Sequence, residues 1–273
     1  MPPTALALAL AAAFVHALWN LLLARARDIE AATAVALVVA VVAFAVPAAA
    51  FWRVDGRVWP YVVGSGAFEL VYFTLLATAY RRAEFSVVYP VARGSAPVLV
   101  LIAAVAILGA STSWPQAAGV ALVAGGVVLV RGFQGGTRRG VAFGLAIGCC
   151  IAAYTLIDKN GIRYANPVSY LELSMVPPTI AYAAAVATAK GVGALRAEVN
   201  PAAVVAGLAT FGAYALALAA LQRAPAASVA AVRETSVIIA TVFAAVFLKE
   251  RVGWVRLTGA VAVAAGIGLL ALA

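Results

Sequence analysis

Two arginines in otherwise apolar stretches are the residues of this 273-residue chain best suited to chemistry. Arg93 and Arg233 each follow the start of an apolar run by about seven residues, which is roughly 10 Å along a helix. Arginine at such depth in a membrane is costly and usually faces a bundle interior or a wet cavity. Two interpretations stay open: the pair binds a carboxylate or phosphorus oxyanion, or each arginine is a structural residue that pairs with Glu or with helix-end carbonyls.

Acidic side chains in the same kind of stretch are the candidate partners. Glu69 shares a helical face with Tyr72 by its i, i+3 spacing. It is a candidate proton-coupling residue or a permanent counter-ion of Arg93, and we favour the counter-ion. Glu234 directly follows Arg233 and therefore points about 100° away around a helix, so we do not expect those two to pair. Glu234 remains a candidate coupling or counter-ion residue.

His16, the one histidine of the sequence, shares a helical face with Trp19 and Asn20. Its ring titrates near neutral pH in an ordinary environment, so it is a candidate coupling residue. The alternative is an interhelical hydrogen bond that fixes the first helix to a neighbour. Trp19 and Asn20 align with Tyr154 and the residue after it at an offset of 135, which favours a role for Trp19, Asn20 and Tyr154 in lining a substrate cavity.

Tyr89 lies one helical turn before Arg93 and so shares its face. Pro90 and Pro97 flank the arginine and predict a bent or locally opened helix. Carbonyls freed at such a bend can line a hydrated cavity. We therefore count Tyr72 and Tyr89, with the residues above, as candidate substrate-binding residues.

The elements that position these residues follow from composition. Apolar residues make up 66% of the chain and charged residues 11%, whereas soluble domains have about 25% charged residues. Long apolar runs without alternation exclude a β-barrel and predict helices of about 20 residues that span a bilayer. The fold class is an all-α polytopic membrane protein. We expect ten transmembrane helices at 4–23, 31–51, 60–79, 86–109, 115–131, 140–157, 167–188, 201–220, 227–248 and 254–272.

The two halves of the chain resemble each other at an offset of 140. Under this offset Arg93 aligns with Arg233, and two Trp and four Gly also align, namely Trp114 with Trp254, Gly119 with Gly259 and Gly126 with Gly266. We expect a first five-helix repeat at 1–136 and a second at 137–273. Five is an odd number, so the second repeat enters the membrane from the opposite side, which is the inverted-repeat arrangement of many secondary transporters.

The loop charges predict the orientation. Loops on one side of the predicted bundle hold twelve Lys and Arg and loops on the other side hold five. Cytoplasmic loops carry the excess, which places both termini outside the cytoplasm in the inner (plasma) membrane. The net charge of +9 therefore requires no nucleic-acid partner.

The sequence contains no constellation that indicates an enzyme. One His and two adjacent Cys do not supply a metal site, and no GxxxxGK[ST] phosphate loop is present. We expect no cofactor. The paired glycines of the last helix in each half suit close helix packing. We expect the bilayer and a small-molecule substrate as partners, and either a monomer or a homodimer.

Several motifs resemble the EamA-type family of the drug/metabolite transporter superfamily across both halves. They are His16-Ala-Leu-Trp-Asn, Tyr89-Pro-Val-Ala-Arg-Gly-Ser, Arg233-Glu-Thr-Ser-Val and Leu248-Lys-Glu-Arg. The resemblance implies a secondary carrier that works by alternating access, commonly an exporter of amino acids or other metabolites. It also implies a central cavity between the repeats.

Our leading expectation is thus an exporter of a small metabolite such as an amino acid or an organic anion. One alternative is a membrane-embedded enzyme or lipid-handling protein, which needs reactive groups clustered at one interface. Here the candidates lie at mirrored depths instead, which favours a carrier. Another alternative is a sensor or structural protein that binds a solute without moving it.

Overall fold

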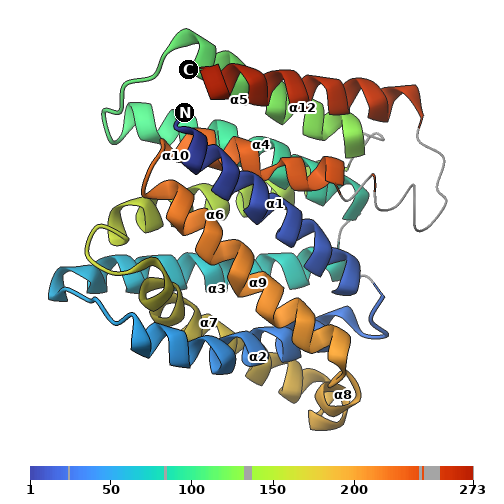
Figure 1. Cartoon of the computed structure of the whole chain (residues 1–273). Helices are drawn as coiled ribbons and strands as arrows, with labels where there is room; N and C mark the ends of the chain where they lie inside the picture. Colours follow the sequence, from blue (N-terminus) through green and yellow to red (C-terminus); the bar gives the residue numbers. More distant parts are fainter. Residues whose placement is uncertain (24, 83–84, 132–136, 240–241, 243–252, 273) are drawn as a thin grey trace.

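The described part of the chain is almost entirely helical (Figure 1). This computed structural model describes residues 1–273 apart from 24, 83–84, 132–136, 240–241, 243–252 and 273. The helices are α1 (Pro3–Leu23), α2 (Ile29–Ala50), α3 (Trp59–Arg82), α4 (Phe85–Ala106), α5 (Trp114–Arg131), α6 (Arg138–Gly161), α7 (Pro167–Lys190), α8 (Val192–Ala197), α9 (Pro201–Leu221), α10 (Ala226–Arg233) and α12 (Trp254–Leu272), with a 3₁₀ turn at Gly56–Val58.

The helices have the length and composition that a bilayer demands. Five in the described part are long and apolar enough to span a membrane: α1, α2, residues Val87–Ala106 of α4, α6 and α9. Two shorter apolar helices cover Trp114–Val130 and Leu257–Leu272. Helices α3 and α7 have 24 residues each, which gives a length of about 36 Å. The expected ten-helix, two-repeat membrane fold accommodates these elements.

Two predicted helices differ from the structure in ways that affect the site. The sixth helix, expected to end at 157, continues to Gly161, so that Asp158 lies within it and is fully buried. The ninth, expected at 227–248, is interrupted at Glu234. There the backbone bonds tighten to i→i+3 spacing, from the N–H of Glu234 to Ala231 and from the N–H of Val237 to Glu234. Residues 235–239 are helical again, and most of the remainder lies outside the described residues.

The main contacts between helices are related to one another by exchange of the two repeats. Helix α1 packs on α9 as α6 packs on α3, and α2 packs on α9 as α7 packs on α3. Likewise α4 packs on α6 as α10 packs on α1, while α2 and α5 each pack on their own counterparts, α7 and α12. Each of the contacts named here therefore has a counterpart under a two-fold exchange of the repeats, as inverted repeats require. The boundary at 136/137 stays a prediction, because 132–136 lie outside the described residues.

Four glycines allow α5 and α12 to approach until their backbones touch. A Cβ built on Gly126 would lie 2.6 Å from the carbonyl oxygen of Gly259, and one on Gly119 would lie 2.9 Å from that of Gly266. The reciprocal distances are 2.7 Å in both cases. These glycines thus serve packing, as the sequence predicts, and they do so within one chain.

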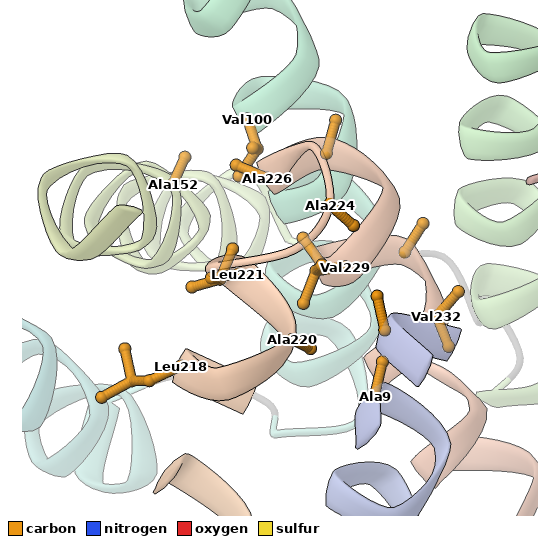
Figure 2. Close-up of a cluster of buried hydrophobic side chains, with 14 of the residues drawn as sticks. Ala9, Val100, Ala152, Leu218, Ala220, Leu221, Ala224, Ala226, Val229 and Val232 are labelled. Atoms are coloured by element: carbon orange, nitrogen blue, oxygen red, sulfur yellow. The ribbon is translucent and has the colours of Figure 1, made fainter. Parts of the chain in front are cut away.

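Small side chains fill the centre where α9 turns into α10 (Figure 2). The labelled buried residues come from α1, α4, α6, α9, α10 and the turn between α9 and α10, and they are Ala9, Val100, Ala152, Leu218, Ala220, Leu221, Ala224, Ala226, Val229 and Val232. Alanine and valine let helices come close in lipid, where van der Waals contact rather than the hydrophobic effect drives their association. This packing holds α10, and with it Arg233, against helices of both repeats.

Both termini lie on one face of the bundle, at the left in Figure 1. The amino group of Met1 donates a hydrogen bond to the carbonyl of Leu270, at 3.2 Å. A chain whose two ends lie on the same face crosses the bundle an even number of times. On the same face, an isolated antiparallel bridge between Val54 and Ala165 ties the loop after α2 to the loop after α6. This bridge therefore links the two repeats on the face where both termini lie.

Candidate functional site

Arg93 of α4 forms a buried ion pair with a residue of the other repeat. Its Nε lies 3.0 Å from Oε2 of Glu234, and the two side chains are 12% and 5% exposed. Its Nη2 also donates to Oγ of Ser236 at 3.3 Å and lies 3.3 Å from Nε2 of His16. The break in the helix after Arg233 presents both Glu234 and Ser236 to this guanidinium. Arg93 is thus neutralised by protein groups.

His16 of α1 lies between two hydrogen-bond donors. Nε1 of Trp19 approaches its Nδ1 at 3.3 Å, and Nη2 of Arg93 approaches its Nε2 at the same distance. Both neighbours can only donate, and a neutral imidazole offers one acceptor nitrogen. Only one of the two contacts is therefore a hydrogen bond at any time. A charged imidazolium at His16 would have no acceptor nitrogen for either Trp19 or Arg93.

Trp19 and Asn20 hold the histidine rather than point independently into a shared space. The rings of Trp19 and His16 pack edge-to-face, with centroids 5.0 Å apart. The side-chain amide of Asn20 donates back to the carbonyl of His16, at 2.8 Å. The i, i+3, i+4 face expected for the three residues is present and is tied together along α1.

Tyrosines surround the two arginines. The ring of Tyr154 contacts that of Tyr72 on one side and that of Tyr214 on the other, each with centroids 6.3 Å apart. Arg93 interacts electrostatically with the hydroxyls of Tyr72, Tyr89 and Tyr154. The candidate aromatic residues from α3, α4 and α6 therefore come together, as the sequence predicts.

Arg233, at the end of α10, differs from Arg93. Its guanidinium carbon lies 5.8 Å from the centre of the Tyr214 ring, in the geometry of a cation–π contact. Within the described residues it forms no ion pair within 4.0 Å. Its charge instead acts on His16, Tyr154 and Glu69. The two arginines, equivalent by repeat, thus have different surroundings.

Glu69 of α3 is buried, with 4% exposure, and it meets a tyrosine rather than an arginine. The hydroxyl of Tyr214 lies 3.0 Å from Oε1 of Glu69 and 2.6 Å from Oδ2 of Asp158. The sequence favoured Glu69 as counter-ion of Arg93. The structure corrects this, because Glu234 holds that place and Glu69 is part of a separate carboxyl pair.

Asp158 is the centre of that pair and was missed by sequence reasoning. Its Oδ1 accepts hydrogen bonds from Oγ of Ser65 at 2.6 Å and from the hydroxyl of Tyr170 at 2.9 Å, in addition to the bond from Tyr214. A predicted helix end at 157 placed Asp158 in a loop. Its i+4 spacing from Tyr154 is the signal that would have placed both on one face.

No group of three or more His, Cys, Asp or Glu side chains that could hold a metal ion occurs among the described residues. The charged and titratable groups at the centre offer electrostatic and proton-transfer chemistry. A neutralised arginine, a second arginine on a tyrosine ring and a pair of carboxyl groups converge between the repeats. Such a site suits the binding of an anion and the gain or loss of a proton.

Comparisons with known proteins agree with this architecture. The EamA-like transporter family matches the chain twice, at residues 3–132 and 138–272. A solved structure titled "Crystal structure of protein" superimposes with a TM-score of 0.78 over 100% of this chain and 98% of its own, at 15% sequence identity. At that identity the likeness shows the fold alone. No curated protein matches.

Proposed function

Because the chain belongs to the EamA-like transporter family, we propose that it is a secondary carrier that exports a small anionic or zwitterionic metabolite by alternating access. The family consists of membrane transporters of the drug/metabolite transporter superfamily. The solute class is inferred from the charges at the centre of the bundle. An amino acid or a small organic acid has the carboxylate that a central arginine recognises.

One observation carries the proposal: Arg233 forms no ion pair among the described residues, whereas Arg93 has Glu234. An arginine deep in a membrane bundle needs an anion or an aqueous cavity. A solute carboxylate at Arg233 supplies that charge. Arg93 then has the structural role and Arg233 the binding role, which divides between them the two interpretations that the sequence left open.

The body of the solute lies against aromatic side chains in this proposal. Tyr72, Tyr89 and Tyr154 lie near Arg93, and the ring of Tyr214 lies 5.8 Å from the guanidinium carbon of Arg233. Trp19 and Asn20 keep His16 in place at the edge of the site. Of the residues that the sequence predicts for the site, Tyr72, Tyr89, Tyr154 and Arg233 contact the solute in this proposal. Trp19, Asn20 and Arg93 act on it through their contacts with protein groups.

Alternating access requires contacts between the repeats that can open on each face. On the face of the termini, the N–H of Asp55 donates to Tyr164 and the N–H of Asn166 donates to Arg53, both at 2.8 Å. On the other face, Asp28 pairs with Lys190 at 2.7 Å. A rocking of one repeat against the other would break these contacts on one face and then on the other.

The proposed setting is the inner (plasma) membrane, with both termini outside the cytoplasm. Twelve Lys and Arg in the loops of one side, against five on the other, support this orientation. The pairing of Met1 with Leu270 supports a common side for both ends.

A thermal-shift screen of the purified protein in detergent tests the solute class. Amino acids, small organic acids, phosphonates and cationic drugs are added in turn, because a compound that binds the native state raises its melting temperature. We expect an anionic or zwitterionic compound to stabilise the wild type and to lose its effect in Arg233→Gln. Arg233→Lys should keep part of it, since the charge remains but the two-pronged geometry is lost.

Arg223→Gln is the matched control, because Arg223, which follows α9, is exposed and its guanidinium bonds only the carbonyl of Ala219 in α9 among the described residues. It should respond like the wild type. Uptake of the stabilising compound into proteoliposomes then separates a carrier from a protein that only binds. Stabilisation by cationic compounds alone, or an unchanged response in Arg233→Gln, would contradict the proposed site.

A further inference from the structure

The hydroxyl of Tyr214 contacts two carboxyl groups but has only one proton to donate. It lies 2.6 Å from Oδ2 of Asp158 and 3.0 Å from Oε1 of Glu69. An ionised carboxylate can only accept. If both carboxyl groups were ionised, one of these two contacts would therefore join two lone pairs with no hydrogen between them.

The other hydrogen bonds decide which group is ionised. Asp158 receives donors from Ser65 and Tyr170 on Oδ1, and the shorter Tyr214 contact is on Oδ2. Three donors around one carboxyl group stabilise its charged form. The hydrogen of Tyr214 then points to Asp158, and Glu69 completes the chain by donating its own proton to the oxygen of Tyr214.

From this geometry we infer that Glu69 is a proton-binding site, linked through Tyr214 to Asp158 and placed so that an anion at Arg233 and a proton at Glu69 favour each other. The part that concerns the anion rests on the proposed function. The part that concerns the proton rests on the hydrogen-bond geometry alone.

The link between the two sites is the Tyr214 ring. Arg233 lies over its face, and the two carboxyl groups lie at its hydroxyl. The positive charge of Arg233 acts on both carboxyl groups and favours their ionised forms. An anion that neutralises Arg233 removes this effect, so that Glu69 keeps its proton to higher pH while the anion is bound than after the anion has left. By linkage the proton equally favours the anion.

The proton also joins the two repeats. Glu69 belongs to α3 of the first repeat, while Tyr214 and Asp158 belong to α9 and α6 of the second. The bond from Glu69 to Tyr214 exists only while Glu69 is protonated, so loss of the proton removes a tie between the repeats. The titratable and charged groups that act on Glu69 from the neighbouring helices are Cys150, Tyr154 and Asp158 of α6, Tyr170 of α7, Tyr214 of α9 and Arg233 of α10.

Infrared spectroscopy of the solute-free protein over a range of pH tests the proton site. The carbonyl stretch of a protonated carboxylic acid is separate from that of a carboxylate. We expect the wild type to show such a band at neutral pH and Glu69→Gln to lose it. Tyr214→Phe keeps the ring under Arg233 but removes a hydrogen-bond partner, so the band should move to higher frequency.

Arg233→Gln mimics an anion-neutralised arginine. We expect the Glu69 band to persist to higher pH in this variant than in the wild type. Glu172→Gln is the control, because Glu172 is a second buried glutamate whose Oε2 has no hydrogen-bond partner among the described atoms. A band from Glu172 should disappear in that variant and stay unchanged in Tyr214→Phe.

Identical spectra for the wild type and Glu69→Gln would overturn the proton site. A band that titrates at the same pH with and without the Arg233 charge would overturn the link to the anion. Because no solute is present in this experiment, a negative result leaves the solute screen unaffected. A solute screen that finds only cationic compounds contradicts the proposed function without altering the infrared result.

Discussion

The Nε of Arg93 and the carboxylate of Glu234 lie 3.0 Å apart and join the first repeat to the second at the centre of the bundle. Glu234 occupies the single turn between α10 and the helical residues 235–239. In an uninterrupted helix the side chain of Glu234 would point about 100° around the helix axis from that of Arg233. The tightened turn instead lets the two adjacent residues serve different partners, Arg233 on Tyr214 and Glu234 on Arg93.

Replacement of Glu234 by Gln should destabilise the protein strongly. Removal of one partner from a buried ion pair leaves an uncompensated charge and costs about 3–5 kcal/mol. We expect the double variant Arg93→Gln/Glu234→Gln to recover part of the loss, which a double-mutant cycle of melting temperatures in detergent measures. Asp55→Asn, which removes an exposed ion pair with Arg57, should have little effect. If the loss of stability in the double variant equals the sum of the losses in Arg93→Gln and Glu234→Gln, Arg93 and Glu234 are not coupled.

Gly126→Ala should destabilise the α5–α12 pair. The new Cβ would lie 2.6 Å from the backbone oxygen of Gly259, and a backbone atom cannot move aside as the end of a side chain can. Overpacking of this kind costs about 1–3 kcal/mol. Gly125→Ala is the matched control, since a Cβ there meets nothing within 4 Å. Thermal unfolding in detergent compares the two variants, and a similar melting temperature for both would contradict the close packing.

Composition and repeats were enough to predict the architecture. Membrane helices reveal themselves by uninterrupted apolar runs, and the two-fold relation is visible in the aligned arginines, tryptophans and glycines. The structure brings the predicted site residues His16, Arg93 and Glu234 together. Apolar periodicity carries this information because bilayer thickness fixes helix length.

The pair of carboxyl groups, Glu69 and Asp158, could not be predicted from the sequence, for two physical reasons. Asp158 lies in the last turn of α6, where polar residues also occur in ordinary loops, so that hydropathy ends the helix too early. Tyr214 lies in a uniformly apolar helix whose sequence marks no preferred face. Its two contacts, with Glu69 and Asp158, depend on where the fold places α9 relative to α3 and α6, which a single sequence does not encode locally.

Asp28→Asn tests the polar contact on the face opposite the termini. Asp28 caps α2 by accepting hydrogen bonds from the N–H groups of Glu30 and Ala31, and it pairs with Lys190. The hydrogen bond from Lys190 lowers the pKa of Asp28. Asn retains a cap, so the loss should be that of a surface ion pair, about 0–1 kcal/mol. Asp28→Ala also removes the cap, which adds about 0.5–2 kcal/mol.

The same contact predicts a pH dependence. A lowered pKa in the folded state means that the ionised form of Asp28 stabilises the fold. This stabilisation is complete above the usual aspartate pKa of about 3.9 and is lost as the pH falls through the folded-state value. The difference in melting temperature between the wild type and Asp28→Asn should therefore be constant near neutral pH and shrink in acid. A difference that grows as the pH falls would contradict the sign.

Two glycines provide a direct test of the membrane orientation. A Cβ at Gly56, in the 3₁₀ turn after α2, or at Gly193, in the short helix α8 after α7, meets nothing within 4 Å, so Cys at either position should be tolerated. In a background with Cys149 and Cys150 replaced by Ala, a membrane-impermeant thiol reagent added to intact cells should label Gly56→Cys and leave Gly193→Cys unlabelled. Permeabilised cells should show both labelled, which controls for reactivity. The reverse pattern in intact cells would place both termini in the cytoplasm, and labelling of both would exclude opposite sides for these two positions.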